Sequence, residues 1–167
     1  YLKVPVQLAI IGPRLDEDYV KEIEQLISAI NEKGIHKVQL LDAMSQHELV
    51  QWYQKAAVVA CPYLYETYSL VALEALACGT PVVSTGDHIV EQRPDGILIS
   101  SKDPQDLSRH IEKLITDKEM RETYGYNGRK IVERYFSWES VLEILVKKYE
   151  HVLNKQIAHN YCSQHES

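Results

Sequence analysis

Hydrophobic residues occur along the chain in two kinds of stretch, short unbroken runs and longer segments with helical spacing. The unbroken runs predict strands, because each is bounded by glycine, proline or polar turn residues. The first, VQLAIIG, is followed by Pro13 and shows no alternation, which is typical of a parallel strand buried on both faces. The five expected strands cover residues 6–12, 36–41, 56–61, 81–85 and 96–100.

The segments between these runs predict helices with recognisable ends. Asp16 or Asp18 can cap the first helix, whose apolar residues recur at spacings of three and four, and Gly34 ends it. Ser45 with Glu48 three residues later predicts a capping box. A further helix is expected over residues 69–78. Three more should follow Asp103-Pro104. Their apolar positions run from Leu107 to Ile115, from Tyr124 to Tyr135 and over about 138–153.

Strands that alternate with helices and are apolar throughout indicate a parallel sheet covered on both faces. The sequence therefore predicts one doubly wound α/β domain. We expect it to occupy residues 1–155, because the stretch 156–167, QIAHNYCSQHES, lacks periodicity and is expected to be a disordered tail.

The composition narrows the possible functions. With 18 Lys and Arg against 24 Asp and Glu, the formal net charge is −6, which disfavours general nucleic-acid binding. The three cysteines, Cys61, Cys78 and Cys162, show no CxxC spacing, so we expect neither a disulfide framework nor a metal site. We therefore expect the protein to lie in a reducing compartment, the cytoplasm. The seven histidines show no ligand spacing. Since the first residue is Tyr1, we expect the chain to be a piece of a longer protein.

The ligand site of an open parallel sheet lies beyond the carboxyl ends of its strands. Four loops are expected there, at residues 12–16, 42–45, 62–69 and 84–91. None contains GxGxxG or GxxxxGK[ST], which disfavours an ordinary dinucleotide or triphosphate site.

The third of these loops carries the most chemistry. Glu66 precedes the helix and Glu74 lies about two turns inside it, in an otherwise apolar stretch. The amides of Tyr68, Ser69 and Leu70 at the helix start favour an anion, whereas carboxylates accept hydrogen bonds from sugar hydroxyls. Together they suggest a phosphate between two polyhydroxylated groups, as in a nucleotide-sugar. Local chemistry equally allows a capping role for Glu66 and an ion pair for Glu74.

The stretch CPYLYETYSLVALEALACGTPVVST resembles the signature P-S-x-x-E-G-F-G-L-x-x-x-E-A-M-A-x-G-x-P-V-V of GT-B glycosyltransferases of the retaining family 4, the glycosyl transferases group 1. The flanking segments are similar too, so the resemblance covers about residues 6–150. It implies a Rossmann-like three-layer α/β/α domain, the C-terminal, nucleotide-sugar-binding half of such an enzyme. It also implies transfer of a sugar, with retention, from a UDP- or GDP-sugar to the hydroxyl of a carbohydrate or lipid-linked acceptor, with no metal or other cofactor.

The resemblance also assigns roles to single residues. It implies that Glu74 holds the ribose hydroxyls and that Glu66 is catalytic and faces the transferred sugar. The remaining donor-binding positions lie in two loops, with Thr67, Tyr68, Ser69, Leu70 and Val71 at the helix start and Ala43 and Met44, beside the base, after the second strand.

The chain also departs from the family pattern. Thr67 and Ser69 replace two glycines, Asp42 replaces another beside the base, and the segment 86–91 is altered. The family's diphosphate-binding Arg and Lys precede the equivalent of Tyr1, as does the acceptor domain. We therefore expect a donor domain truncated on its N-terminal side that transfers nothing by itself.

Other interpretations remain open. The chain could be a non-catalytic nucleotide-sugar-binding module, a nucleotide-sugar epimerase of the same fold, or a purely structural domain. Arg14 could touch phosphate or be a solvated loop residue, and His88 and Glu91 could contact ligand or serve the loop. Tyr63 and Tyr65 could stack on a ligand or pack against loops. Peripheral membrane association would depend on the missing domain, and an uncovered helix over 138–153 would favour self-association.

Overall fold

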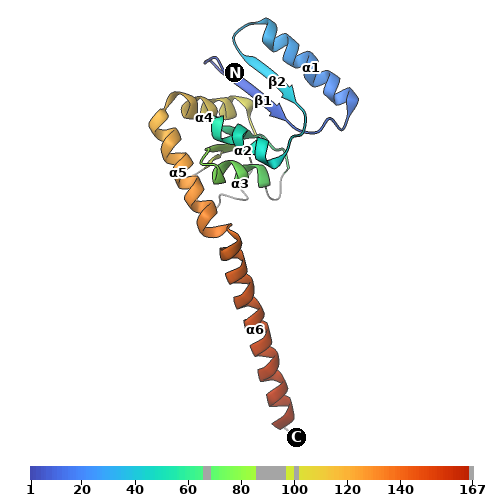
Figure 1. Cartoon of the computed structure of the whole chain (residues 1–167), viewed down its shortest axis with the longest axis vertical. Coiled ribbons are helices and arrows are strands. Elements are labelled where there is room, and N and C mark those ends of the chain that lie inside the picture. The colour runs from blue at the N-terminus through green and yellow to red at the C-terminus, as the bar shows by residue number, and fades with distance from the viewer. Residues whose placement is uncertain (66–68, 86–96, 100–101, 166–167) are drawn as a thin grey trace.

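The computed structural model describes residues 1–65, 69–85, 97–99 and 102–165, with the backbone alone for 97–99 and 156–165. Its strands and helices follow one another in the predicted order, alternating from β1 to β4 (Figure 1). The elements are β1 (Gln7–Ile11), α1 (Glu17–Glu32), β2 (Lys37–Leu41), α2 (Gln46–Lys55), β3 (Val59–Cys61), α3 (Leu70–Ala77), β4 (Val82–Ser84), β5 (Ile97–Ile99), α4 (Pro104–Thr116), α5 (Lys118–Tyr135) and α6 (Trp138–His165).

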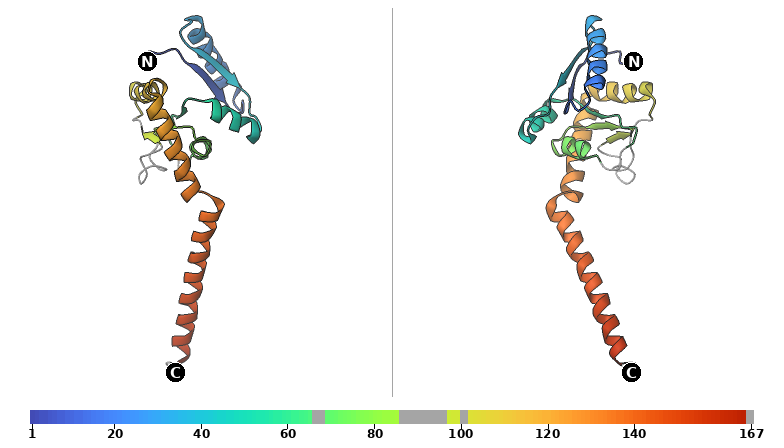
Figure 2. Two further views of the ribbon diagram at one scale, coloured as in Figure 1. Left: turned by 60° about the vertical axis from the view of Figure 1, so that its left-hand side comes forward. Right: turned by 90° about the vertical axis from the view of Figure 1, so that its right-hand side faces the viewer.

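The predicted α/β fold with parallel strands is confirmed. β1 pairs with β2, and β4 lies between β3 and β5, each pair being parallel. Among the described residues, however, these strands form two sheets and not one continuous sheet. Figures 1 and 2 show the β1–α1–β2 unit beside a second unit that contains β3, β4, β5 and the helices α3 to α5.

The helix ends follow the local signals in the sequence. Asp16 caps α1, its carboxylate accepting from the amides of Asp18 at 3.0 Å and Tyr19 at 2.9 Å. The capping box of α2 is complete, because Ser45 and Glu48 each accept from the other's backbone amide. Gly79 follows α3 with a φ of 77°, a conformation that side chains disfavour, and so lets the chain turn into β4.

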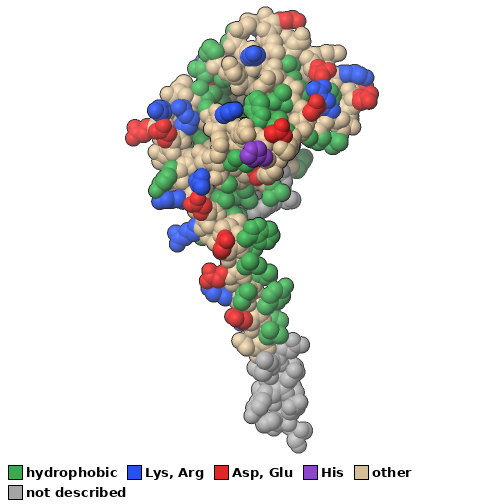
Figure 3. All heavy atoms as spheres, in the orientation of Figure 1, with side chains coloured by type: hydrophobic (Ala, Val, Ile, Leu, Met, Phe, Trp, Pro, Cys, Tyr) green, Lys and Arg blue, Asp and Glu red, His purple; other side chains and the backbone are tan. Residues whose placement is uncertain are grey.

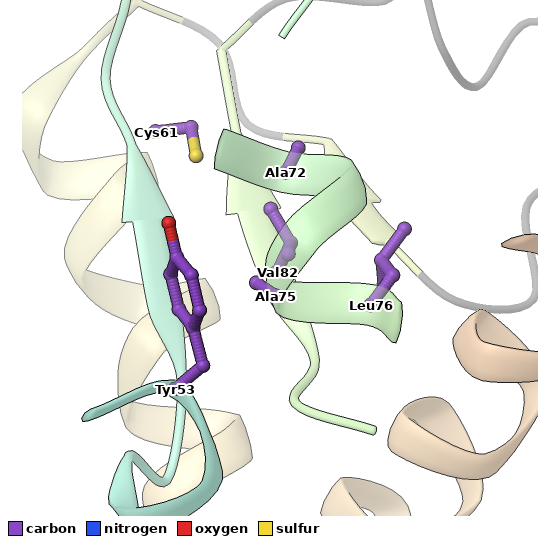
Figure 4. Close-up of a cluster of buried hydrophobic side chains, with 6 residues drawn as sticks. All are labelled: Tyr53, Cys61, Ala72, Ala75, Leu76 and Val82. Atoms are coloured by element: carbon purple, nitrogen blue, oxygen red, sulfur yellow. The ribbon is translucent and has the colours of Figure 1, made fainter. Parts of the chain in front are cut away.

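The densest part of the core lies between α3 and the three-stranded sheet (Figure 4). α3 is apolar on nearly all sides, because it packs against α5 as well as against β3 and β4. Gly125 makes the α5 contact possible, since a Cβ at this position would lie 2.1 Å from the carbonyl oxygen of Gly79. The buried cluster comprises Tyr53, Cys61, Ala72, Ala75, Leu76 and Val82.

The last helix, α6, extends away from the body of the molecule (Figures 1 and 2). Figure 3 shows hydrophobic side chains along one side of it. The exposed apolar residues are Trp138, Val141, Leu142, Ile144, Leu145, Val146, Tyr149, Val152 and Leu153. The helix continues to His165, into the segment 156–167 for which the sequence suggests a disordered tail. Once a helix is nucleated, each further residue adds a hydrogen bond, so it can extend beyond its periodic part.

Candidate functional site

The start of α3 presents a polar cap with exposed apolar residues around it. Ser69 is the N-cap, and its hydroxyl accepts from the amide of Ala72 at 3.2 Å and donates to the Tyr63 hydroxyl at 3.3 Å. The side chains of Leu70 and Val71, in the first turn, are exposed. The first-turn amides carry the positive end of the helix dipole, so this end of α3 favours a negative group.

Glu74 lies one turn further along α3 and is hydrogen-bonded to α2 on both carboxylate oxygens. Its Oε2 accepts from the Tyr53 hydroxyl at 2.9 Å, and its Oε1 accepts from the Gln46 side-chain amide at 3.0 Å. Both donors are neutral, so neither compensates the negative charge. A carboxylate can accept about four hydrogen bonds, and the described residues supply these two.

Tyr53 is the more firmly held of the two donors. Its ring is buried in the core cluster (Figure 4), and its carbonyl accepts from the Thr80 hydroxyl at 2.6 Å. Burial, and then the hydrogen bond to Glu74, raise the pKa of the Tyr53 hydroxyl well above its usual value. The hydroxyl therefore remains a proton donor to Glu74 at any ordinary pH.

The loop after β2 is brought close to Glu74 by the same contacts. Ala43 is exposed and Met44 is half-buried in this loop, and Gln46 begins α2 directly after it. Because Gln46 reaches Glu74, the start of α2, directly after this loop, lies beside α3.

Arg14, in the loop after β1, is held by two carboxylates. Its Nε donates to Asp42 at 2.6 Å and its Nη1 donates to Glu24 at 2.6 Å. These hydrogen bonds, first that to Asp42 and then that to Glu24, raise the pKa of the guanidinium above its usual value. Arg14 is thus an exposed loop residue whose ion pair with Asp42 bridges the loops after β1 and β2, and its contacts give a phosphate-binding role no support.

Several predicted residues lie outside the described part of the chain. These are Glu66, Thr67 and Tyr68 of the third loop and His88 and Glu91 of the fourth. On the near side of the third loop, Tyr65 is 94% exposed, and the Lys102 ammonium lies 4.9 Å from the centre of its ring. Tyr65 is thus almost fully exposed at the surface, beside the Lys102 ammonium.

Two residues of the site were not singled out from the sequence. These are Gln46 and Tyr53, because nothing in the sequence beside either residue points to Glu74. One chemical argument could have found Tyr53. A buried tyrosine hydroxyl usually has a hydrogen-bond partner, and Glu74 is an acceptor in an otherwise apolar stretch. Among the described residues, no group of three or more His, Cys, Asp or Glu is placed to hold a metal ion.

Comparison with known proteins assigns the chain to a family. Residues 2–131, which include β1 to β5 and reach into α5, match the profile of the glycosyl transferases group 1. The chain belongs to the glycosyl transferases group 1 family. Within the group 1 glycosyltransferases it corresponds to the C-terminal domain of the GT-B fold.

The relatives of this glycosyltransferase domain are longer proteins. A D-inositol 3-phosphate glycosyltransferase of Corynebacterium jeikeium is 37% identical over 134 residues, which are 77% of this chain and 32% of the relative. The chain thus spans about a third of the length of the curated relatives that it matches.

Solved structures share the fold. Sucrose-phosphate synthase from Thermosynechococcus elongatus superposes with a TM-score of 0.74 at 22% identity, over 92% of this chain and 46% of that one. The Anabaena protein HepE in complex with UDP superposes with a TM-score of 0.72 at 18% identity, over 89% of this chain and 49% of that one. No helix among the described residues of the glycosyltransferase domain is both long and apolar enough to cross a membrane.

Proposed function

We propose that the chain is the donor-binding domain of a retaining glycosyltransferase, which moves a sugar from a nucleotide diphosphate-sugar to an acceptor hydroxyl. The observation that carries the proposal is the Glu74 carboxylate, which two neutral donors of α2 orient and which can accept about four hydrogen bonds in all. A carboxylate of this kind is suited to a ligand that brings neutral hydroxyls, and ribose is such a group.

The first turn of α3 supplies the complementary interaction. The amides at its start, of Tyr68, Ser69 and Leu70, would cover the sugar and diphosphate, and Val71 would lie by the ribose. Ala43 and Met44, across the site, would hold the base, and Glu74 between them would hold the ribose. The transferred sugar would then extend toward Glu66, Thr67 and Tyr68, where Glu66 would face it as the catalytic residue.

The relatives support the same class of ligand. HepE was crystallised with UDP and with UDP-glucose, and the relative from Corynebacterium jeikeium is named as a glycosyltransferase that acts on D-inositol 3-phosphate. We propose a UDP- or GDP-sugar as the donor and a carbohydrate or lipid-linked hydroxyl as the acceptor. The departing diphosphate would be stabilised by amides and cationic side chains, with no metal required.

The proposal predicts nucleotide binding without turnover by the 167-residue chain. Residues 1–155 would form the donor domain, truncated on its N-terminal side, and the acceptor would bind elsewhere in the whole protein. Transfer from UDP-glucose to any acceptor by this chain alone would refute this part of the proposal. Release of free sugar without an acceptor would instead indicate an epimerase.

Binding can be tested by titrating the chain with UDP, GDP and ADP while recording amide shifts by NMR. We expect one nucleotide to shift the amides from Leu70 to Glu74 most strongly, and Glu74→Ala to weaken binding, so that these shifts appear only at much higher nucleotide concentration. Glu122→Ala, which removes an exposed carboxylate from α5, is the matched control and should bind as the wild type does. If none of the three nucleotides shifts these amides, the donor-site assignment is wrong for this chain.

A further inference from the structure

The loop between β2 and α2 is held at both of its ends by side-chain hydrogen bonds. At the first end, the Asp42 carboxylate accepts from Nε of Arg14 at 2.6 Å. At the second end, Ser45 donates to the carboxylate of the α2 capping box, from its amide at 2.9 Å and from its hydroxyl at 2.6 Å. Only Ala43 and Met44 lie between these two residues in the sequence. The path of this short backbone segment therefore depends on both attachments.

Arg14 is in turn held by α1. Its Nη1 donates to the Glu24 carboxylate at 2.6 Å, so one guanidinium joins a carboxylate of α1 to the carboxylate of Asp42. Because the guanidinium is planar and directs its donors along fixed lines, the position of Asp42 is tied to that of α1. An isolated ion pair at the surface contributes little, whereas a cation shared by two carboxylates restrains the groups that it connects.

The backbone beneath this ion-pair bridge supports the same arrangement. β1 and β2 are parallel, so their carboxyl ends lie at one edge. There the Gly12 amide donates to the Leu41 carbonyl at 3.2 Å. Asp42 follows Leu41 directly and Arg14 lies two residues after Gly12. The ion pair therefore extends, through side chains, the contact that the two strands make through their backbones.

The far end of the loop leads to the proposed donor site. Gln46, which begins α2, donates to Oε1 of Glu74 at 3.0 Å. In the proposed function, the backbone of Ala43 and Met44 would hold the base, and Glu74 would hold the ribose. Hydrogen bonds weaken steeply when their angle departs from the preferred range. A displacement of residues 43–44 would therefore disturb the base more than the ribose or the diphosphate.

We propose that Arg14 is a positioning residue for recognition of the nucleobase. By holding Asp42, it fixes the backbone of Ala43 and Met44 and so contributes to the discrimination among nucleoside diphosphates. Arg14 acts through Asp42 and does not itself touch the nucleotide. The inference rests on the proposed function, since it takes the base to lie against residues 43–44.

The positioning can be measured first without a ligand, in the 167-residue chain. Arg14→Met keeps a long side chain and removes its charge and its donors. We expect this variant to shift the amide resonances of Ala43 and Met44 and to lower their NMR order parameters. Lys21→Met removes an exposed ion pair with Asp18 on α1 and is the matched control, which should leave both amides unchanged.

Titration with UDP, GDP and ADP then tests the effect on the base. Arg14→Met should weaken binding of the preferred nucleotide about three- to fivefold and that of the other two by less than about twofold. The ratio of affinities therefore falls, whereas general damage to the site would weaken all three equally. Arg14→Lys keeps the charge but not the planar fork, so it should recover only part of the selectivity.

A double substitution identifies the route. If Arg14 acts through Asp42, then Arg14→Met should cause no further loss of selectivity in an Asp42→Ala background. An equal loss in both backgrounds would mean that Arg14 contacts the nucleotide itself, which would overturn the proposal.

Other results would also overturn it. One is an Arg14→Met chain in which the amides of Ala43 and Met44 behave as in the wild type. Another is an equal loss of affinity for all three nucleotides, or a wild-type chain that binds all three equally. A wild-type chain that binds none of them would refute the proposed function and this inference with it. Wild-type binding with unchanged selectivity in Arg14→Met would refute the inference alone.

Discussion

The Tyr53 hydroxyl donates a hydrogen bond of 2.9 Å to Oε2 of Glu74 and thereby joins α2 to α3 at the proposed donor site. Tyr53 is anchored in the core, so it fixes the direction of the carboxylate from the buried side. A ligand at the proposed donor site would bond to Glu74 at acceptor positions other than these. Tyr53 is in this sense a positioning residue for Glu74.

Replacing Tyr53 by phenylalanine should weaken nucleotide binding while leaving the fold in place. We expect affinity to fall about fivefold and stability to fall by about 1 kcal/mol, the typical net value of one hydrogen bond. Isothermal titration and thermal unfolding measure the two effects. Tyr126→Phe, at an exposed tyrosine of α5, is the control and should change neither.

A double substitution separates positioning from general damage. If Tyr53 acts through Glu74, then Tyr53→Phe should have no further effect on affinity in a Glu74→Ala background. Equal losses in both backgrounds would mean that Tyr53 influences binding by another route.

The close approach of α5 to the end of α3 predicts a strong response to one added methyl group. A Cβ on Gly125 would lie 2.1 Å from the Gly79 carbonyl oxygen, which belongs to backbone and cannot rotate away. We expect Gly125→Ala to cost about 2–3 kcal/mol and to lower Tm by roughly 8 °C. Gly12→Ala, where nothing lies within 4 Å, is the control and should be tolerated. A Gly125→Ala protein with the wild-type Tm would contradict this packing.

The capping box of α2 predicts a pH-dependent contribution to stability. Hydrogen bonds from the hydroxyl and the amide of Ser45 lower the pKa of Glu48 below its ordinary value of 4.5. The ionised form therefore stabilises the native state above that ordinary value, and the effect disappears as the pH falls through the lowered one. Glu48→Gln should thus lower Tm most at pH 7, and the difference from wild type should narrow toward pH 3. A difference that is constant over this range would exclude a contribution from ionisation.

The exposed apolar side of α6 predicts self-association of the 167-residue chain. Leu142, Leu145 and Tyr149 lie on one side of the helix at spacings of three and four, and all are exposed. Sedimentation velocity should show an oligomer that grows with concentration and is lost in Leu145→Lys. His151→Lys adds the same charge on the opposite side of α6 and should associate as the wild type does. A chain that stays monomeric at several hundred micromolar would contradict the expectation.

Local signals in the sequence were sufficient for most of the element boundaries. The residues that begin or end a helix contact only backbone within about one turn, so their roles could be predicted without the rest of the fold. They are Asp16, Ser45 with Glu48, and Gly79. Contacts between distant segments could not. The hydrogen bond from Tyr53 to Glu74 spans 21 residues and that from Arg14 to Asp42 spans 28, and nothing in the composition near either residue specifies its partner.

The division of the sheet was hidden for a related reason. Apolar runs such as VQLAIIG predict strands that are covered on both sides, but they do not say which neighbour covers them. The pattern therefore indicated the parallel class correctly and could not reveal that β1 and β3 have no strand between them among the described residues.

The parts of the molecule built on the two sheets should unfold at different free energies. Every completely buried side chain that the structure describes belongs to the part built on β3, β4, α3 and α4, whereas the β1–α1–β2 unit contributes a single buried apolar residue, Val38. Cooperative units unfold at free energies that follow their buried contacts. The β1–α1–β2 unit should therefore fluctuate open on its own while the remainder stays folded, so that the domain has two melting units along one chain.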